Sequence, residues 1–285
     1  MERPLIALNV IVSPGVGETF REMLRSVASA VDEVVLGYNH DDETALAVAR
    51  EEVPENVHLV PVPLEWRGHY AWARNQLLKA TTAEVILWLD HDDILVLDKQ
   101  TEPEQKRRAL KLLADLMLSR KQLDAFTFPY HYSFHADGRV EVSHYRERLF
   151  RLDDRLKWKF RVHEGIGVGH GDAPPNWARN DQLTVVHANR VRDEDRTARI
   201  MPGLWCQLAD YQPDNGFSED DPPALYDPLE GLEGEERDAR IDTLWRNTTE
   251  PRTVMYFGLQ YYNDRRPDLA EMWFERFLSW DGAKQ

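Results

Sequence analysis

Residues 84–93, EVILWLDHDD, say most about how this chain folds. The six residues from Glu84 to Leu89 are nearly all apolar, which is typical of a strand buried on both faces of a sheet. Acidic side chains follow at once, at Asp90, Asp92 and Asp93. In a parallel sheet, ligands bind beyond the carboxyl ends of the strands. The stretch therefore predicts an internal strand that delivers carboxylates to a ligand site.

Strand and helix signals alternate on the N-terminal side of this stretch. The expected strands, apolar runs of strand length, are 5–12, 33–38, 57–62 and 84–89. The expected helices, where apolar residues recur at helical spacing, are 20–28, 44–52 and 69–79. Alternating strands and helices predict an α/β fold, with a parallel sheet and helices on its faces.

The pattern changes after Asp93. An apolar stripe predicts a helix over 104–119, and 125–134 and 140–148 are strand-like, joined by a turn with an Asp-Gly pair. Proline, glycine and acids dominate 212–236, which predicts a mobile loop that is functional or disordered. The tail, 251–280, has the pattern of two amphipathic helices.

Composition excludes several protein classes. Among the 285 residues no apolar run approaches the roughly 20 that a membrane-spanning helix needs. Asn9 interrupts the apolar start, which we interpret as a strand rather than a signal peptide. Cys206 is the single cysteine, so we expect no intrachain disulfide and a reducing, cytoplasmic location. The net charge of −15 argues against a surface made for nucleic acid or anionic lipid.

That charge is unevenly placed along the sequence. Residues 210–250 hold 13 acidic and 3 basic side chains, a local charge of −10. Residues 144–163 hold 7 basic and 3 acidic ones, with aromatic residues between them. This basic segment suits a donor diphosphate or an anionic acceptor such as nucleic acid, or it is a solvated face.

The spacing of the acidic residues suggests a metal. Asp90 and Asp92 are two residues apart, so their carboxylates can converge on one hard cation. Mg²⁺ and Mn²⁺ prefer such oxygen ligands and also bridge diphosphate oxygens. The alternative is that these acids only cap the next helix.

Four motifs make the sequence resemble glycosyltransferase family 2. They are Asp32-Glu33-Val34-Val35, Asp42-Glu43-Thr44, Ala73-Arg74-Asn75 and Leu89-Asp90-His91-Asp92-Asp93. The resemblance covers residues 1 to about 190 and implies the GT-A fold, a Rossmann-like mixed sheet with helices on both faces. Arg148-Leu149-Phe150-Arg151 and Val162-His163-Glu164 resemble later motifs of bacterial members with a tetratricopeptide-like tail.

The resemblance implies three parts of the chain. We expect a GT-A-like catalytic domain over 1–190, a helix and the acidic mobile loop over 191–250, and a helical hairpin tail over 251–285. One helical hairpin cannot bury its own apolar face, so the tail is expected to dock on the catalytic domain.

The resemblance also implies roles for the acidic residues and their neighbours. Asp90 and Asp92 are the expected DxD pair, which reaches the donor ribose and the metal-bound diphosphate. Asp93 would orient this pair or contact the acceptor. Arg74 and Asn75 would lie beside the nucleotide.

Further site residues follow from position in the family pattern. His187 lies where related enzymes often place another metal ligand; otherwise it is a polar residue at a strand end. Tyr38 and Asn39 replace the aspartate that often holds the base, so Tyr38 would stack on it and Asn39 would pair with its edge. The alternative is a plain strand-end turn. Glu164, followed by Gly-Ile-Gly, is the candidate catalytic base, unless it only pairs with a neighbouring arginine.

The predicted function is a hexosyltransferase-type transfer, with inversion, from a nucleotide-diphosphate sugar to an acceptor hydroxyl, assisted by Mn²⁺ or Mg²⁺. A UDP-sugar is the expected donor, and a glycan or protein the expected acceptor. One alternative is the same chemistry on a hydroxymethylated base in phage DNA. Others are a haloacid-dehalogenase-like phosphotransferase with Asp90 as nucleophile, and a non-catalytic interaction protein.

Overall fold

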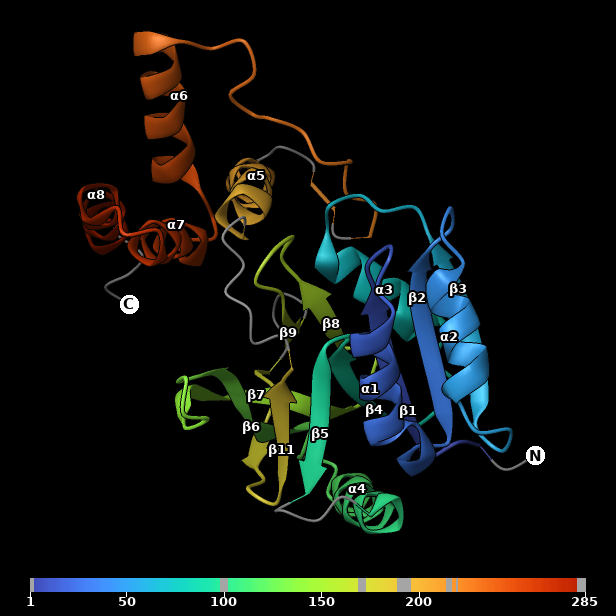
Figure 1. Ribbon diagram of the computed structural model, residues 1–285. Coiled ribbons are helices and arrows are strands. Elements are labelled where there is room, and N and C mark those ends of the chain that lie inside the picture. The colour runs from blue at the N-terminus through green and yellow to red at the C-terminus, as the bar shows by residue number, and fades with distance from the viewer. Residues whose placement is uncertain are drawn as a thin grey trace. The chain divides into compact units, whose positions relative to one another are not determined.

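The computed structural model describes residues 3–97, 102–168, 173–188, 196–213, 217–218 and 220–280. The chain divides into two compact units. The sheet unit comprises 1–65, 73–158 and 166–191, and the helical unit comprises 66–72, 159–165 and 192–285. Figure 1 shows the elements of each unit.

The first part of the chain alternates strands and helices, as the sequence predicts. Its elements are β1 (Ile6–Val12), α1 (Glu18–Val27), the 3-10 helix η1 (Ala28–Ala30), β2 (Glu33–Asn39), α2 (Thr44–Glu52), β3 (His58–Leu64), α3 (Tyr70–Ala80) and β4 (Val85–Asp90). β1 pairs in parallel with both β2 and β4, and β2 pairs in parallel with β3. The predicted parallel sheet is confirmed.

Further strands turn this parallel sheet into a mixed one. The remaining elements of this part are β5 (Asp93–Leu97), α4 (Pro103–Ser119), β6 (Ala125–Phe134), β7 (Val140–Arg151), β10 (Trp177–Arg179) and β11 (Leu183–His187). The strand order is β3-β2-β1-β4-β7-β6-β11-β5, with β10 on β6. β8 (Leu156–Lys159) and β9 (Gly165–Val168) form a separate two-stranded sheet. The predicted pair of strands over 125–134 and 140–148 is the antiparallel β6–β7 pair.

The connection between β4 and β5 requires the sheet to curl. Three strands separate β4 from β5 in the sheet, yet only His91 and Asp92 join them in sequence. Four steps across a flat sheet measure roughly 19 Å. The three backbone steps from Asp90 to Asp93 span at most about 11 Å. The sheet therefore curls until β5 returns toward the end of β4, which brings β11, the neighbour of β5, to the acidic turn.

Helices cover both faces of the sheet, as expected for the fold class. Alternate strand residues such as Leu8 and Leu87 form one core with α1, α2 and α4. The opposite face carries α3, which packs close to β2. A Cβ on Gly37 would lie 2.7 Å from the Cδ1 atom of Leu77, so glycine is needed at that approach.

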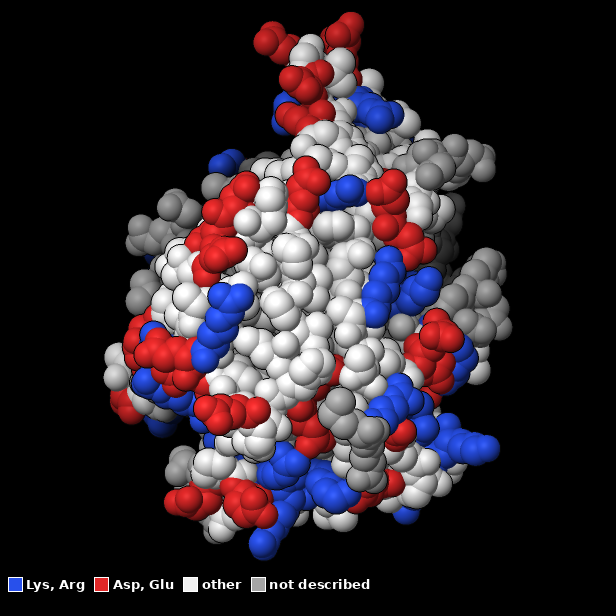
Figure 2. Space-filling model, turned by 90° about the vertical axis from the view of Figure 1, so that its right-hand side faces the viewer, with Lys and Arg blue, Asp and Glu red and all other residues white. Residues whose placement is uncertain are grey.

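β3 forms one edge of the sheet and contains Pro61 and Pro63. Both prolines pair in register with β2, opposite Leu36 and Tyr38. Because proline has no amide hydrogen, their nitrogens occupy positions that face away from β2. Figure 2 faces this edge of the sheet, and an uncharged area lies there between groups of charged side chains.

The helical unit contains α5 (Arg196–Asp210), α6 (Gly234–Asn247), α7 (Arg252–Asn263) and α8 (Pro267–Ser279). Its core includes Leu208 of α5, Leu244 of α6, Phe257 of α7 and Trp273 of α8. The two helices predicted for the tail are present as α7 and α8. Within the described ranges, every helix is too short or too polar to cross a lipid bilayer.

The described part of the predicted loop over 212–236 is attached to the helical unit. Arg67 donates a hydrogen bond of 2.6 Å to Asp221, and the hydroxyl of Tyr226 donates one of 3.1 Å to Asp210. α6 begins inside the range predicted as a loop, with two acids in its first turn. The helix dipole favours negative charge at that end, which is the signal that a loop interpretation misses.

Candidate functional site

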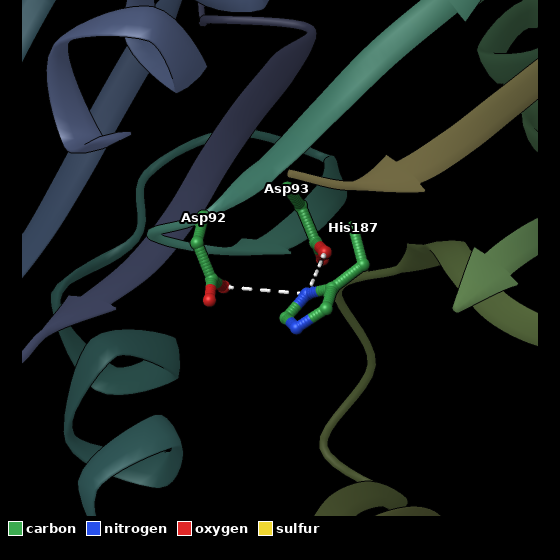
Figure 3. Close-up of side chains that lie close together, drawn as sticks. All are labelled: Asp92, Asp93 and His187. Carbon is green, nitrogen blue, oxygen red and sulfur yellow. Dashed lines mark ion pairs between the residues drawn. The ribbon is translucent and has the colours of Figure 1, made fainter. Parts of the chain in front are cut away.

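The acidic turn after β4 meets the end of β11. His187 is the last residue of β11 and pairs with Asp93, the first residue of β5. Its Nδ1 atom lies 3.6 Å from Oδ1 of Asp92 and 3.5 Å from Oδ1 of Asp93 (Figure 3). Each of these residues offers one ligand atom within 4.8 Å of the others. Two carboxylates and an imidazole form a donor set that suits Mn²⁺.

Asp93 is fully buried, and only one of its oxygens is hydrogen-bonded. Oδ2 accepts a hydrogen bond of 3.0 Å from the backbone nitrogen of Asp90 and lies 3.0 Å from Nη1 of Arg148. Oδ1 has no hydrogen-bond partner among the residues that the structure describes. A buried carboxylate oxygen without a partner is costly. A cation bound with Asp92 and His187 would satisfy this oxygen, so the residues present fit a divalent ion.

Two tyrosines of β6 contact the imidazole. The hydroxyl of Tyr130 lies 3.2 Å from Nδ1 of His187, and the ring of Tyr132 stacks on it at 5.2 Å and 15°. Burial raises the pKa of Tyr130, so its hydroxyl keeps its proton. Burial alone would lower the pKa of His187, but the neighbouring carboxylates of Asp93 and Asp92, 3.5 and 3.6 Å from its Nδ1 atom, outweigh it and raise that pKa.

Asp90 and Asp92 have opposite electrostatic environments. Burial raises the pKa of Asp92, because the charge of His187 offsets only part of the desolvation. Burial acts in the same direction on Asp90, but the charges of Arg74, Arg148 and Arg146 outweigh it, and the pKa of Asp90 is lowered. Asp90 is thus already neutralised by arginines, whereas the positive charge near Asp92, that of His187, does not offset its burial.

The gathered ligand set differs from the predicted one in one member. The sequence predicts Asp90, Asp92 and His187, and the structure gathers Asp92, Asp93 and His187. Oδ1 of Asp90 instead accepts a hydrogen bond of 2.6 Å from Nη2 of Arg74. Metal binding by Asp90 stays a prediction.

Arg74 and Asn75, the expected nucleotide neighbours, are buried at the start of α3. Arg74 is 4% exposed and pairs with Asp90. The side-chain amide of Asn75 donates to the carbonyl of Trp158 and accepts from its backbone nitrogen, both at 2.9 Å. These contacts hold α3 to the β8 strand. A direct contact of either residue with a nucleotide stays a prediction.

The other predicted residues lie on two segments, Tyr38 and Asn39 on β2 and Glu164 in 159–165. Tyr38 belongs to the main core and is 8% exposed, and Asn39 ends β2. Nearby, Asp42 accepts hydrogen bonds from the backbone nitrogens of Gly15 and Thr44 and so ties the loops after β1 and β2 together. Base recognition by Tyr38 and Asn39 stays a prediction.

Glu164 belongs to segment 159–165 of the helical unit. Phe160 and His163, close to it in sequence, have positive φ angles of 78° and 53°. Strained non-glycine backbone of this kind concentrates at functional sites. The ring of His163 stacks on Tyr256 at 3.9 Å, which supports the strained turn. The role of Glu164 as catalytic base stays a prediction.

The sequence analysis did not identify Tyr130 as a site residue, nor Arg148 as the partner of Asp93. The register of β6 against β7 shifts between Phe126 and Thr127, which pair with Leu149 and Glu147. Arg148 is therefore the extra residue of a β-bulge, and such bulges re-aim side chains. A bulge depends on long-range pairing and leaves no local pattern, although tyrosines two apart on β6 indicate a shared face.

The basic segment 144–163 is mostly engaged within the protein. Arg148 pairs with Asp93, and Arg161 pairs with Asp210. Arg151 donates hydrogen bonds to carbonyls at the end of α4, and Arg155 pairs with Asp124 and Asp153. Most of these cations are therefore committed to internal carboxylates and carbonyls, which weakens the interpretation of this segment as a solvated face or a nucleic-acid surface.

Residues 10–103 match the family model described as glycosyl transferase family 2. This match contains the acidic turn but covers a third of the chain. A TPR repeat-containing protein of Synechococcus elongatus is 25% identical over 237 residues, which are 80% of this chain and 52% of the relative. The SPbeta prophage-derived glycosyltransferase SunS of Bacillus subtilis is 22% identical over 189 residues, 65% of this chain and 40% of the relative.

Among solved structures, the mannosyltransferase PcManGT of Pyrobaculum calidifontis, in complex with GDP-Man and Mn²⁺, aligns with 98% of this chain and 88% of its own. The TM-score is 0.49 and the identity 14%. The chain spans about half the length of the Synechococcus relative and less of SunS, so donor and acceptor do not transfer from them. What the sequence match shows is similarity to glycosyltransferase family 2 over residues 10–103, the part of the chain that contains the acidic turn.

Proposed function

We propose that this chain transfers a sugar from a nucleoside-diphosphate donor to an acceptor hydroxyl, with inversion and with a divalent cation as cofactor. One observation carries the proposal. The acidic turn, which lies within the segment that matches the family, brings Asp92 and Asp93 against the imidazole of His187, and the buried Oδ1 of Asp93 has no hydrogen bond among the described residues. Mn²⁺ is the expected ion, since imidazole joins carboxylates in the donor set, and Mg²⁺ is the alternative.

The three residues have distinct tasks in this proposal. Asp92 supplies the carboxylate whose burial is only partly offset by positive charge, Asp93 supplies its Oδ1 atom, and His187 must give up its proton to bind a metal. The bound ion would neutralise charge on the departing diphosphate. The ring of Tyr132, stacked on the imidazole, would help to hold His187 in position.

Glu164 is the proposed base. Its carboxylate would take the proton of the acceptor hydroxyl while the acceptor oxygen bonds to the anomeric carbon. The bond from that carbon to the diphosphate breaks at the same time, and the diphosphate leaves with the electron pair. A single displacement of this kind inverts the anomeric configuration. The strained turn around His163 supports a functional role for this segment.

For the acceptor we propose a glycan or protein hydroxyl before modified phage DNA. A net charge of −15 disfavours a long polyanion, and the arginines of the basic segment are largely paired internally. For the donor we propose a UDP-sugar, to be compared directly with GDP-sugars.

The first test is a screen of nucleotide sugars for thermal stabilisation with and without Mn²⁺. Ligand at about one hundred times its Kd stabilises a folded protein by about 2.7 kcal/mol. We expect stabilisation by one donor class that requires Mn²⁺, and slow release of the nucleoside diphosphate. The matched pair of variants is Asp92→Asn, which should lose both signals, and Asp115→Asn, on the exposed side of α4, which should keep both.

Absence of stabilisation by every nucleotide sugar would contradict the proposal. Stabilisation that persists in Asp92→Asn would contradict the assignment of the metal site. Trapping of phosphate on Asp90 would instead support the phosphotransferase alternative, although Asp90 is held by Arg74.

A further inference from the structure

Three arginine side chains surround the indole ring of Trp88. The guanidinium carbons of Arg74, Arg146 and Arg148 lie 4.4, 4.6 and 4.0 Å from the ring centroid. We call these three residues the Trp88 arginine cluster. Trp88 itself is buried in β4, two residues before Asp90. The cluster therefore concentrates positive charge in the sheet unit next to the acidic turn.

Two members of the cluster are buried and pair with carboxylates of the acidic turn. Arg74 pairs with Asp90, and Arg148 pairs with Asp93. Both arginines are buried, with 4% and 0% of their surface exposed. Arg146 is half-buried on β7, opposite Phe128. Arg146 is thus the member whose guanidinium a ligand from solution can contact.

Arg148 has more hydrogen-bond donors than the described residues accept. Nε and Nη2 of Arg148 are buried and have no hydrogen-bond partner among the described residues. Its guanidinium also lies 4.5 Å from the ring of Tyr130, which attracts the cation but accepts no strong hydrogen bond. A buried guanidinium with unused donors raises the positive potential around it, because burial reduces screening by water.

The chemistry of the cluster selects its ligand class. Arginine presents a planar fork that matches phosphate oxygens, and it stacks on aromatic rings without losing this fork. Arg146, backed by the indole of Trp88, is a fork of this kind. Trp88 lies two residues before Asp90 on β4, and the turn that follows carries Asp92, the proposed metal ligand. A ligand that contacts both Arg146 and a metal ion at Asp92 needs two linked anionic groups.

We propose that Arg146 binds the diphosphate of the donor directly, so that part of the affinity for a diphosphate persists without any divalent cation. The inference rests on the proposed function and deepens it, since it assigns a protein cation to the same leaving group. Arg74 and Arg148 act at a distance, through their charge and by holding Asp90 and Asp93.

The test measures binding by calorimetry in EDTA, with inorganic pyrophosphate, UDP and uridine as probes. We expect the wild-type protein to bind pyrophosphate and UDP weakly, and uridine more weakly still. Arg146→Gln should lower the affinity for both diphosphates about tenfold or more, because it removes a charged hydrogen-bonding group. The affinity for uridine should stay unchanged. Higher salt should weaken diphosphate binding by the wild type far more than by the variant.

Two further variants make the result specific. Arg146→Lys keeps the charge but loses the fork, and we expect it to restore only part of the affinity. Arg108→Gln is the matched control, since Arg108 is an exposed arginine of α4 that pairs with Glu104. It should bind all three probes as the wild type does. If Arg146→Gln unfolds, the comparison of Arg146→Lys with the wild type decides in its place.

The outcomes separate this inference from the proposed function. If the wild type binds a nucleotide sugar with Mn²⁺ but no diphosphate in EDTA, the inference is wrong and the function stands. Equal diphosphate affinity in the wild type and the Arg146 variants would overturn it as well. If no nucleotide sugar binds even with Mn²⁺, the proposed function itself fails.

Discussion

The molecule contains two buried arginine–aspartate pairs with the same chemistry and different surroundings. In the helical unit, Arg161 donates to Asp210 at 3.0 Å and also to the carbonyls of Arg67 and Pro223. Asp210 in turn accepts from Tyr226. In the sheet unit, Arg148 pairs with Asp93, but two nitrogens of the arginine and one oxygen of the aspartate have no hydrogen-bond partner among the described residues.

The contrast separates a structural pair from a functional one. A buried ion pair stabilises a fold only when its remaining donors and acceptors are satisfied. The pair of Arg161 meets this condition and ties three segments of the helical unit together. The pair of Arg148 does not meet it, and a cation or an anion would complete it. Incomplete satisfaction of a buried pair thus points to a ligand more directly than burial or charge alone.

The largest effect is expected from Asp92→Asn, beside the incomplete pair. The substitution removes the carboxylate whose burial is only partly offset by positive charge and keeps its shape. We expect transfer to fall by roughly a thousandfold or more, since a metal supplies several kcal/mol of charge stabilisation. The melting temperature should hold, because a neutral amide is easier to bury than a carboxylate. Transfer assays and thermal unfolding check this pair of results, and an active, metal-independent variant would refute the site.

Asp210→Asn breaks the satisfied pair instead. It leaves the guanidinium of Arg161 buried without its counter-ion, which costs about 3 kcal/mol or more. Urea unfolding followed by tryptophan fluorescence measures the loss. The control is Asp242→Asn, because Asp242 pairs with Arg246 at the surface of α6. A loss below about 1 kcal/mol for Asp210→Asn would mean that the pair does not hold the helical unit together.

His69 reports on the surroundings of the satisfied pair through pH. Burial, with the charge of Arg161, lowers its pKa to about 3. In the unfolded chain His69 is protonated below about pH 6.5, whereas in the folded protein it stays neutral there. The free energy of unfolding therefore falls as the pH drops below 6.5. Between pH 7 and pH 5 we expect a loss of roughly 2 kcal/mol from this group.

His69→Asn removes this contribution while its side-chain oxygen can still accept the hydrogen bond from the Trp72 nitrogen. Urea midpoints at the two pH values, compared with the wild type, measure the difference. His135→Asn, an exposed histidine in the turn between β6 and β7, is the control. An unchanged pH dependence in His69→Asn would show that folding does not lower the pKa of His69.

The smallest effect is expected from Asp221→Asn. Asp221 is 84% exposed and pairs with Arg67, which also donates to the carbonyl of Pro222. Exposed ion pairs contribute about 0.2–1 kcal/mol. We therefore expect Asp221→Asn to lower the free energy of unfolding, measured in urea, by less than about 1 kcal/mol. This loss should be smaller still at high salt. A larger loss would mean that this exposed pair stabilises the fold as the buried pair of Arg161 and Asp210 is expected to do.

Local patterns predict the fold more fully than the site. The strands β1 to β4 and the helices α1 to α4 follow from apolar spacing, because each is decided by residues close in sequence, whereas β5 was not predicted. The curl of the sheet is not local, since it depends on β5 pairing with β11, almost ninety residues later. Asp92 and His187 were expected at the site through the family resemblance. Asp93 as a third ligand and Arg148 as its partner depend on the curl and the bulge, which no local pattern encodes.

The prolines of β3 have a consequence for how the chain behaves in crowded solution. An open sheet edge offers amide hydrogens to which another chain can add as a further strand. At Pro61 and Pro63 the edge presents carbonyls without any amide hydrogen between them on that side. The amide hydrogens of an added strand can bond to these carbonyls, but its own carbonyls meet no amide hydrogen at the two prolines. The hydrogen-bond ladder between the two strands is therefore interrupted. The protein can thus leave this edge uncovered and still resist self-association into extended β-aggregates.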